Sequence, residues 1–404
     1  MADKIIVSQI GARHRYAIPR ALEKQGLLYR LYTDSTSSSF LGRIAGFLSK
    51  CGFLSSSINR LCNRTPKVSE TKLYSSDKLF IKSFLYKLLH KDSLQRQLLV
   101  FDGLSDRCIK WGVSEADCVY GMYFENFKFL QYAKSKGLKV VVDIYERPMT
   151  YKLLIDEIKG NKEYSVFLPL VPMYEDKHKI RMKYIEDLLA LADFYTVPSM
   201  NVAKSLKQFA NFEEQKVCYM PYASSIVPSS YNWKPRKHRI LFVGSDVVNK
   251  GVLYCARAAT ELKKTYPDLD FRIVGLSRNE NTQSPVFDDL NFVGFVNKKQ
   301  LEAEYCSAEA LVFPTLFEGF AGAVIEAASC GCPIITTENA GTDLNEFPAI
   351  YILEKNSDAI VEAVVNIFEN KENRDSLSKR VFEYSRKFTP AEYERRLVDC
   401  LSKI

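Results

Sequence analysis

Long apolar runs are missing from this sequence of 404 residues. One of the longest, residues 166–171, follows two charged residues closely and falls far short of the ~20 residues that a membrane-spanning helix needs. The first ten residues lead from a short polar start straight into a predicted strand, without the basic and apolar regions of a signal peptide. We therefore expect a cytoplasmic protein that has no transmembrane helix.

Histidine is scarce, with four residues, and the ten cysteines include no Cys-x-x-Cys pair. The nearest two, Cys330 and Cys332, flank a glycine in an apolar stretch that reads as the end of a helix. This spacing is typical neither of a zinc knuckle nor of a disulfide framework. We expect reduced thiols, no metal site and no bound cofactor.

The net charge of +8 comes from one part of the chain. Residues 40–100 contain eleven Lys or Arg against three acidic residues, so the rest of the chain is neutral overall. Apolar residues recur in this segment at helical spacing: Phe40, Ile44, Phe47, Cys51, Leu54, Ile58 and Leu61. Two interpretations fit, namely helices that dock on an anionic membrane surface at the inner face of the membrane, or core helices with basic outer faces. No nucleic-acid partner is expected.

The chain is longer than proteins that fold around a single hydrophobic core usually are, which favours two domains. The start reads as strand, a turn at Gly11, helix, and strand again, which is a βαβ unit. Further short strands alternate with helices in both halves: Cys118–Tyr120, Lys139–Ile144, Phe194–Val197, Ile240–Val243, Phe271–Val274, Leu290–Val293, Ala310–Phe313 and Pro333–Thr336. The predicted class is α/β, with two Rossmann-like domains whose parallel sheets face a central cleft.

A Pro-rich, Ser-rich and basic stretch between residues 224 and 239 lacks periodicity and predicts the domain boundary. We assign residues 1–225 to an N-terminal domain and residues 238–385 to a C-terminal domain. Residues 386–404 contain an amphipathic helix whose length suits packing back across the junction.

The strongest motif runs from Phe313 to Thr337 as strand, glycine-containing loop, helix and strand. Two carboxylates eight positions apart fall in the loop, Glu318, and on the helix, Glu326. The loop leads into a helix N-terminus, where free backbone N–H groups and the helix dipole favour a diphosphate.

This segment resembles the E-x7-E signature of the family-4 group of retaining glycosyltransferases, which have the GT-B fold. The strand ending at Gly244 and the Lys250-Gly251 pair resemble the donor-phosphate segment of that family. Residues 292–296, 339–342, 192–199 and 217–222 resemble its other landmarks, so the likeness is good over residues 191–342 and only general elsewhere.

The resemblance implies a role for each matching residue. Glu318 would bind donor-sugar hydroxyls, Glu326 the ribose, and Lys250 the leaving diphosphate. The catalytic residues would be Glu318 and Lys250, and the reaction would need no metal. The implied donor-binding set is Gly244, Ser245, Lys250, Phe295, Glu318, Gly319, Phe320, Ala321 and Glu326, in which the N–H groups of residues 319–321 assist Lys250 and Phe295 neighbours the base.

The sequence departs from the family pattern at three places. Ser245 stands where an arginine is usual, and Ala321 replaces a glycine, which is tolerable if its φ is negative. The acceptor-site histidine of the family's N-domain has no counterpart, and Tyr145 or Glu146 follows the corresponding strand. With Gly11 and His14 of the first turn, these two residues form the expected acceptor site.

The resemblance therefore implies a hexosyltransferase that acts with retention, moving a sugar from a nucleotide-diphosphate sugar to a glycan or a lipid-linked glycan in polysaccharide or glycoconjugate biosynthesis. Two alternatives stay open. One is another GT-B enzyme, such as a nucleotide-sugar epimerase. The other is a catalytically degenerate subunit that binds nucleotide without turnover, as Ser245 and the altered region at Tyr145 suggest.

Overall fold

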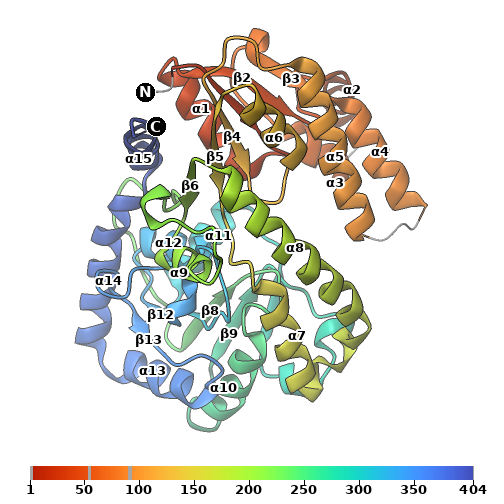
Figure 1. Cartoon of the computed structure of the whole chain (residues 1–404). Helices are drawn as coiled ribbons and strands as arrows, with labels where there is room; N and C mark the ends of the chain where they lie inside the picture. Colours follow the sequence, from red (N-terminus) through yellow and green to blue (C-terminus); the bar gives the residue numbers. More distant parts are fainter. Residues whose placement is uncertain (1–2, 53–55, 90–92, 404) are drawn as a thin grey trace.

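Two parallel sheets, each covered by helices, form the two halves of the molecule (Figure 1). The computed structural model describes residues 3–52, 56–89 and 93–403. The predicted α/β class with two parallel sheets is confirmed. Leu54 of the apolar series in the basic segment lies outside the described residues.

The N-terminal sheet has seven strands in the order β3-β2-β1-β4-β5-β6-β7, and every neighbouring pair is parallel. Its central strands are buried on both faces, which explains their continuous Ile, Val and Tyr runs. The strands are β1 Ile5–Ser8, β2 Leu28–Thr33, β3 Leu73–Ser75, β4 Cys118–Met122, β5 Lys139–Asp143, β6 Phe194–Val197 and β7 Val217–Tyr219.

The C-terminal sheet has six strands in the order β10-β9-β8-β11-β12-β13, again all parallel. The strands are β8 Arg239–Val243, β9 Asp270–Val274, β10 Asn291–Gly294, β11 Ala310–Phe313, β12 Ile334–Thr336 and β13 Ile350–Tyr351.

The α-helices connect successive strands or follow the second sheet. In the N-terminal half they are α1 Ala17–Lys24, α2 Phe40–Lys50, α3 Ser56–Cys62, α4 Asp77–Leu88, α5 Ser93–Trp111, α6 Phe127–Ser135, α7 Thr150–Gly160, α8 Val171–Leu191 and α9 Met200–Leu206. Then follow α10 Val252–Thr265, α11 Lys298–Ser307, α12 Gly322–Ser329, α13 Ser357–Glu369, α14 Lys371–Ser385 and α15 Pro390–Leu401. None of the described helices combines the length and the apolar content that crossing a bilayer needs.

Both sheets reverse their strand order beside the first strand of the half. In the N-terminal sheet the reversal lies between β1 and β4, and in the C-terminal sheet between β8 and β11. Ligands of open α/β sheets bind at the carboxyl ends of the strands beside such a switch point. The loops that follow β1, β8 and β11 therefore hold the candidate site.

Two segments cross between the halves. Helix α7 comes before the linker in sequence, yet Leu154, Ile155 and Ile158 pack in the core of the C-terminal sheet. Helix α15 follows the C-terminal sheet, yet Tyr393 and Leu397 pack in an N-terminal core beside β1 and α1. Packing of residues 386–404 back across the junction is the arrangement that the sequence suggested, whereas a single boundary between residues 225 and 238 does not describe the crossing of α7, because a helix packs where its apolar face finds a partner.

Candidate functional site

The loop that contains Glu318 runs from β11 to α12, as the sequence predicts. Glu318 lies before the helix, and Glu326 lies in the first turns of α12. The loop is anchored from behind, because the N–H of Glu318 donates to Asn339 O (3.1 Å) and that of Ala321 donates to Ala340 O (2.8 Å). Backbone hydrogen bonds thus anchor the loop on both sides of Gly319 and Phe320.

Gly319 is the point at which this loop meets the N-terminal half. A Cβ atom at this position would lie 1.9 Å from the carbonyl oxygen of Tyr145, which follows β5. The hydroxyl of Ser199 also donates to Gly319 O over 2.6 Å. Only a glycine allows the backbones of the two halves to approach so closely.

The loop after β8 brings Lys250 to the same place. Asp246 accepts the N–H groups of Val248 and Asn249 (3.0 and 2.9 Å), which closes a turn directly before Lys250. Gly251 follows with φ of 70°, and a Cβ atom there would lie 2.3 Å from Pro314 O. The loops that follow β8 and β11 therefore pack closely at Gly251, and any other residue at this position would be strained.

Lys250 and Glu318 form an ion pair in this structure, although they are far apart in sequence. Both side chains are largely buried, at 19% and 16% exposed, and the ammonium of Lys250 also lies over the ring of Phe313. Burial lowers the pKa of Lys250 to about 8, with the charge of Asp246 opposing the shift. The pair sets one positive and one negative group at the carboxyl ends of adjacent strands.

Glu326 is oriented by two hydroxyl groups. Tyr305 of α11 donates to one carboxylate oxygen over 3.3 Å, and Ser225 of the linker donates to the other. Burial, followed by the neighbouring Glu326 charge, raises the pKa of Tyr305, so its hydroxyl stays a donor. The carboxylate thus has a fixed direction at the edge of the cleft.

The remaining residues of the implied donor set have different surroundings. Gly244 directly follows β8, and Ser245 comes next with an exposed side chain. Phe295 is 81% exposed after β10, two strands from β8 in the sheet. The prediction that the N–H groups of residues 319–321 all face the diphosphate is wrong for Ala321. Its N–H already donates to Ala340 O and is not free for a diphosphate. Ala321 has φ of −79°, as a residue with a Cβ atom requires.

In the N-terminal half, the turn after β1 places His14 beside a buried carboxylate. His14 Nε2 lies 3.5 Å from Asp143 Oδ2 at the end of β5, and the imidazole packs on the ring of Tyr222 at 4.0 Å between centroids. Gly11 precedes this turn with φ of 66°, and its N–H donates to Asp34. The structure therefore brings His14 to the carboxyl edge of the first sheet.

Tyr145 and Glu146 are both engaged within the N-terminal half. The guanidinium of Arg13 lies 4.0 Å from the ring centre of Tyr145 and donates to Glu125 Oε1 over 2.6 Å. Glu146 instead pairs with Arg181 of α8. Tyr145 and Glu146 are the two candidates for the position of the family's acceptor-site histidine. Tyr145 contacts Arg13, which belongs to the His14 turn, whereas the charge of Glu146 is already compensated by Arg181.

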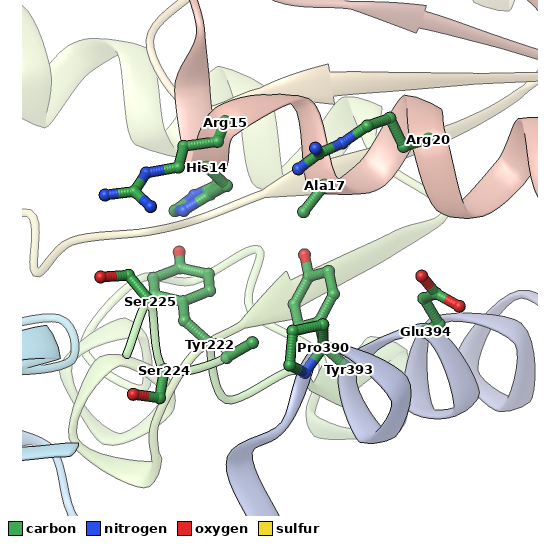
Figure 2. A pocket seen from close by; sticks show the side chains of 11 residues that line it. His14, Arg15, Ala17, Arg20, Tyr222, Ser224, Ser225, Pro390, Tyr393 and Glu394 are labelled. Atoms are coloured by element: carbon green, nitrogen blue, oxygen red, sulfur yellow. The ribbon is translucent and has the colours of Figure 1, made fainter. Parts of the chain in front are cut away.

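An open cavity of about 480 Å³ lies beside these groups (Figure 2). It is bounded above by the turn and first helix after β1, and below by the linker and α15. Its lining includes His14, Arg15, Arg20, Tyr222, Ser225 and Tyr393. Because Ser225 also contacts Glu326, the cavity adjoins the candidate donor site.

Several residues of the site were not identified from sequence. Asp143 ends β5 and stands next to the end of the strand predicted at Lys139–Ile144, and that position was a usable signal, whereas Ser225, Tyr305 and Glu125 carry no local pattern. Among the described residues no three His, Cys, Asp or Glu side chains gather as metal ligands.

Comparisons with known proteins find similarity to glycosyltransferases. Residues 237–370 match the family model described as Glycosyl transferases group 1. An uncharacterized glycosyltransferase, MJ1607, from Methanocaldococcus jannaschii is 28% identical over 140 residues, which cover 32% of this chain and 36% of that protein. The 2-deoxystreptamine N-acetyl-D-glucosaminyltransferase of Niallia circulans is 30% identical over 26% of this chain and 28% of its own length. The matched region spans about a third of the length of these curated relatives.

Solved structures share the fold over the whole chain. Sucrose-phosphate synthase from Thermosynechococcus elongatus superposes with a TM-score of 0.64 at 13% identity, covering 99% of this chain and 98% of that one. Staphylococcus aureus TarM, solved with fondaparinux, alpha-GlcNAc-glycerol and UDP, gives a TM-score of 0.63 at 10% identity, covering 98% and 99%. Anabaena HepE with UDP and glucose gives 0.62 at 11% identity, with complete coverage of both chains. The expected GT-B architecture is confirmed.

Proposed function

We propose that this chain, a GT-B protein whose C-terminal half is of the group 1 glycosyltransferase type, transfers a sugar from a nucleotide-diphosphate sugar to a glycan or lipid-linked glycan, with retention and without a metal. The observation that carries the proposal is the ion pair of Lys250 and Glu318 at the strand ends of the C-terminal sheet, with Glu326 on the helix that follows the Glu318 loop. Phe320 of the same loop contacts Tyr222, on which the imidazole of His14 packs. We place donor binding in the C-terminal half and acceptor binding in the N-terminal half.

Donor binding exchanges the partners of the Lys250–Glu318 ion pair. The diphosphate attracts the ammonium of Lys250, and the freed carboxylate of Glu318 accepts hydrogen bonds from the sugar hydroxyls. Each of the two groups has an ion-pair or hydrogen-bonding partner before and after this exchange, so neither is left buried without one. The Phe320 N–H and the N-terminus of α12 add donors for the phosphate oxygens.

We propose the following reaction at these groups. The bond between the anomeric carbon and the phosphate oxygen breaks, and the nucleoside diphosphate leaves with the electron pair. The acceptor hydroxyl oxygen bonds to the anomeric carbon on the same face, and its proton passes to the departing phosphate oxygen. Lys250 stabilises the charge that develops on that oxygen, which is the step at which a fixed cation has its largest effect.

The close contact at Gly319 supports a closed cleft during transfer. Tyr145 O and Ser199 hold the donor loop against the N-terminal half. A closed cleft keeps water away from the anomeric carbon and so favours transfer over hydrolysis of the donor.

Glu326→Ala is expected to weaken binding of the nucleoside diphosphate about tenfold or more, because a carboxylate that accepts two ribose hydroxyls is lost. Calorimetric titration of the variant and the wild type measures the change. Glu362→Ala, at an exposed position on α13, is the matched control and is expected to bind as the wild type does. Equal affinity in Glu326→Ala and the wild type would remove Glu326 from the donor site.

The membrane-docking interpretation of residues 40–100 also enters the proposal. Phe40 and Phe47 of α2 are 74% and 67% exposed, and α4 exposes Ile81, Phe84, Leu85 and Leu88 beside Lys78, Lys82 and Lys87. The N-termini of both helices are joined through Asp77, which accepts from Leu41 N (3.0 Å) and Ser39 Oγ (2.6 Å). Both helices lie at the outer edge of the N-terminal half (Figure 1). Apolar side chains next to lysines are typical of a surface that docks on anionic lipid.

Reversing the charge at Lys78, Lys82 and Lys87 to glutamate is expected to lower partitioning onto phosphatidylserine-containing vesicles about 100-fold or more, since each lysine contributes ~1 kcal/mol near such a surface and each glutamate adds repulsion. Vesicle sedimentation measures the bound fraction. The same reversal at the exposed lysines Lys204, Lys371 and Lys379 is the control. Full retention of the first variant on vesicles would exclude docking through α4.

The function itself is tested by incubating the protein with a panel of nucleotide sugars, with and without glycan acceptors. The expected result is release of nucleoside diphosphate that depends on an acceptor, with a product whose anomeric configuration, read by NMR, equals that of the donor. A changed sugar in the absence of acceptor would indicate an epimerase instead. Nucleotide binding without turnover of any donor would indicate a degenerate subunit.

A further inference from the structure

The cavity between the His14 turn and α15 has an excess of positive charge. Arg15 and Arg20 both line it, and no acidic side chain pairs with Arg15 among the described residues. Among the residues that the structure describes, Arg20 donates only to the carbonyl oxygen of Tyr16 (3.2 Å). Glu394, the carboxylate of the lining, pairs with Lys24 over 2.7 Å. Burial and then the charge of Arg15 lower the pKa of Arg20, with Glu394 opposing.

The backbone conformation that brings these side chains together is costly. His14, Arg15 and Tyr16 are three consecutive non-glycine residues in the left-handed region, with φ of 47°, 52° and 59°. Each such residue costs on the order of 1–3 kcal/mol, and such strain clusters at binding sites. Here the strain directs His14 and Arg15 toward the cavity (Figure 2).

The opposite wall supplies donors without acceptors. The hydroxyl of Tyr222 is buried and has no hydrogen-bond partner among the described residues. In Figure 2 it points up toward the His14 turn, as does the hydroxyl of Tyr393. A buried hydroxyl without a partner costs about 1–3 kcal/mol, which a ligand that accepts from it recovers. The rings of the two tyrosines add flat apolar walls.

The cavity also adjoins the donor site. Ser225 lines the cavity and donates to Glu326, the residue placed at the ribose. The volume of about 480 Å³ is that of a small-molecule site rather than of a single ion.

From this geometry we infer that the cavity between the His14 turn and α15 binds an acidic group of the acceptor sugar, either a phosphate monoester or a carboxylate. The inference rests on the proposed function, because it takes the ligand beside the donor to be the acceptor. Arg15 and Arg20 bind the anion, Tyr222 donates to it, and the aromatic walls contact the sugar ring. The acceptor of this enzyme is then an anionic glycan rather than a neutral one.

Calorimetric titration tests the inference on the full chain, saturated with the nucleoside diphosphate that binds it. The probes are glucose 6-phosphate, glucuronate, glucose and inorganic phosphate. We expect at least one of the two acidic sugars to bind tenfold or more tightly than glucose and inorganic phosphate, and which of the two binds identifies the anion. Arg15→Gln with Arg20→Gln is expected to abolish this preference. Arg15→Gln alone changes an exposed side chain and is expected to reduce the preference for the acidic sugar without abolishing it.

Arg380→Gln is the control for a lost positive charge, since Arg380 is exposed on α14. Nucleotide binding with no preference for an acidic sugar would overturn the inference and leave the proposed function standing. Inorganic phosphate binding as tightly as glucose 6-phosphate would mean an adventitious ion only. Preference for acidic sugars that survives the double substitution would also overturn it. If no nucleoside diphosphate binds, the proposed function fails first and the acceptor role fails with it.

Discussion

Lys250→Ala is expected to lower kcat by about 100-fold or more, because it removes the cation that stabilises the leaving diphosphate. The side chain is held for this role before substrate arrives, by its ion pair with Glu318 and by the turn that Asp246 closes. Since the interaction strengthens as the phosphate oxygen gains charge, kcat should fall more than nucleotide affinity. Steady-state kinetics of the variant and of Lys250→Arg, which keeps a positive charge, provide the measurement.

Removal of Lys250 also leaves Glu318 without its partner, and a buried unpaired charge destabilises a fold. The double variant with Lys250→Ala and Glu318→Gln separates the two effects, since it contains no unpaired carboxylate. The account predicts that the double variant is as stable as the wild type and still inactive. Recovery of turnover in the double variant, or unchanged turnover in Lys250→Ala, would refute the assignment of Lys250.

Gly319→Ala is expected to lower kcat/KM about 100-fold although it adds a single methyl group. Its Cβ atom would lie 1.9 Å from Tyr145 O and 2.9 Å from the carbonyl carbon. These are backbone atoms, which cannot rotate away, so the two halves must separate locally and the Ser199 bond to Gly319 O is strained. A misplacement of about 1 Å at a reacting centre costs on the order of 10² in rate.

The measurement is kcat/KM together with the melting temperature. Overpacking of this kind destabilises by about 1–3 kcal/mol, so the melting temperature should fall as well. Gly160→Ala is the control, because a Cβ atom there meets nothing within 4 Å. Wild-type kinetics in Gly319→Ala would show that the closed contact between the halves is not needed for transfer.

The fold was largely predictable from sequence because its signals are local. Short β-rich runs that alternate with helices identified most strands of both sheets, and Glu318 and Glu326 were assigned correctly to the loop and helix after β11. The ion pair between Lys250 and Glu318 follows from the order of β8 and β11 in the sheet, since the ends of neighbouring parallel strands meet.

The features that could not be predicted from the sequence depend on tertiary packing. The sequence of α7 shows an apolar face but not that Leu154 and Ile158 bury it against the C-terminal sheet. The N–H of Ala321 is taken by a carbonyl on a later segment, which no pattern in the loop reveals. The same holds for Asp143, whose position opposite His14 depends on how β1 and β5 sit in one sheet.

Thermal unfolding of the wild-type protein with uridine, guanosine, adenosine and cytidine diphosphates, each with and without magnesium, tests for a nucleotide-sugar site in the C-terminal half. A ligand that binds only the folded state increases the free energy of unfolding by about 2.7 kcal/mol when its concentration is a hundred times Kd. The melting temperature rises as a result. We expect a magnesium-independent rise with one of the four nucleotides, and that nucleotide identifies the base of the donor. The absence of a rise with all four would contradict a nucleotide-sugar site in the C-terminal half.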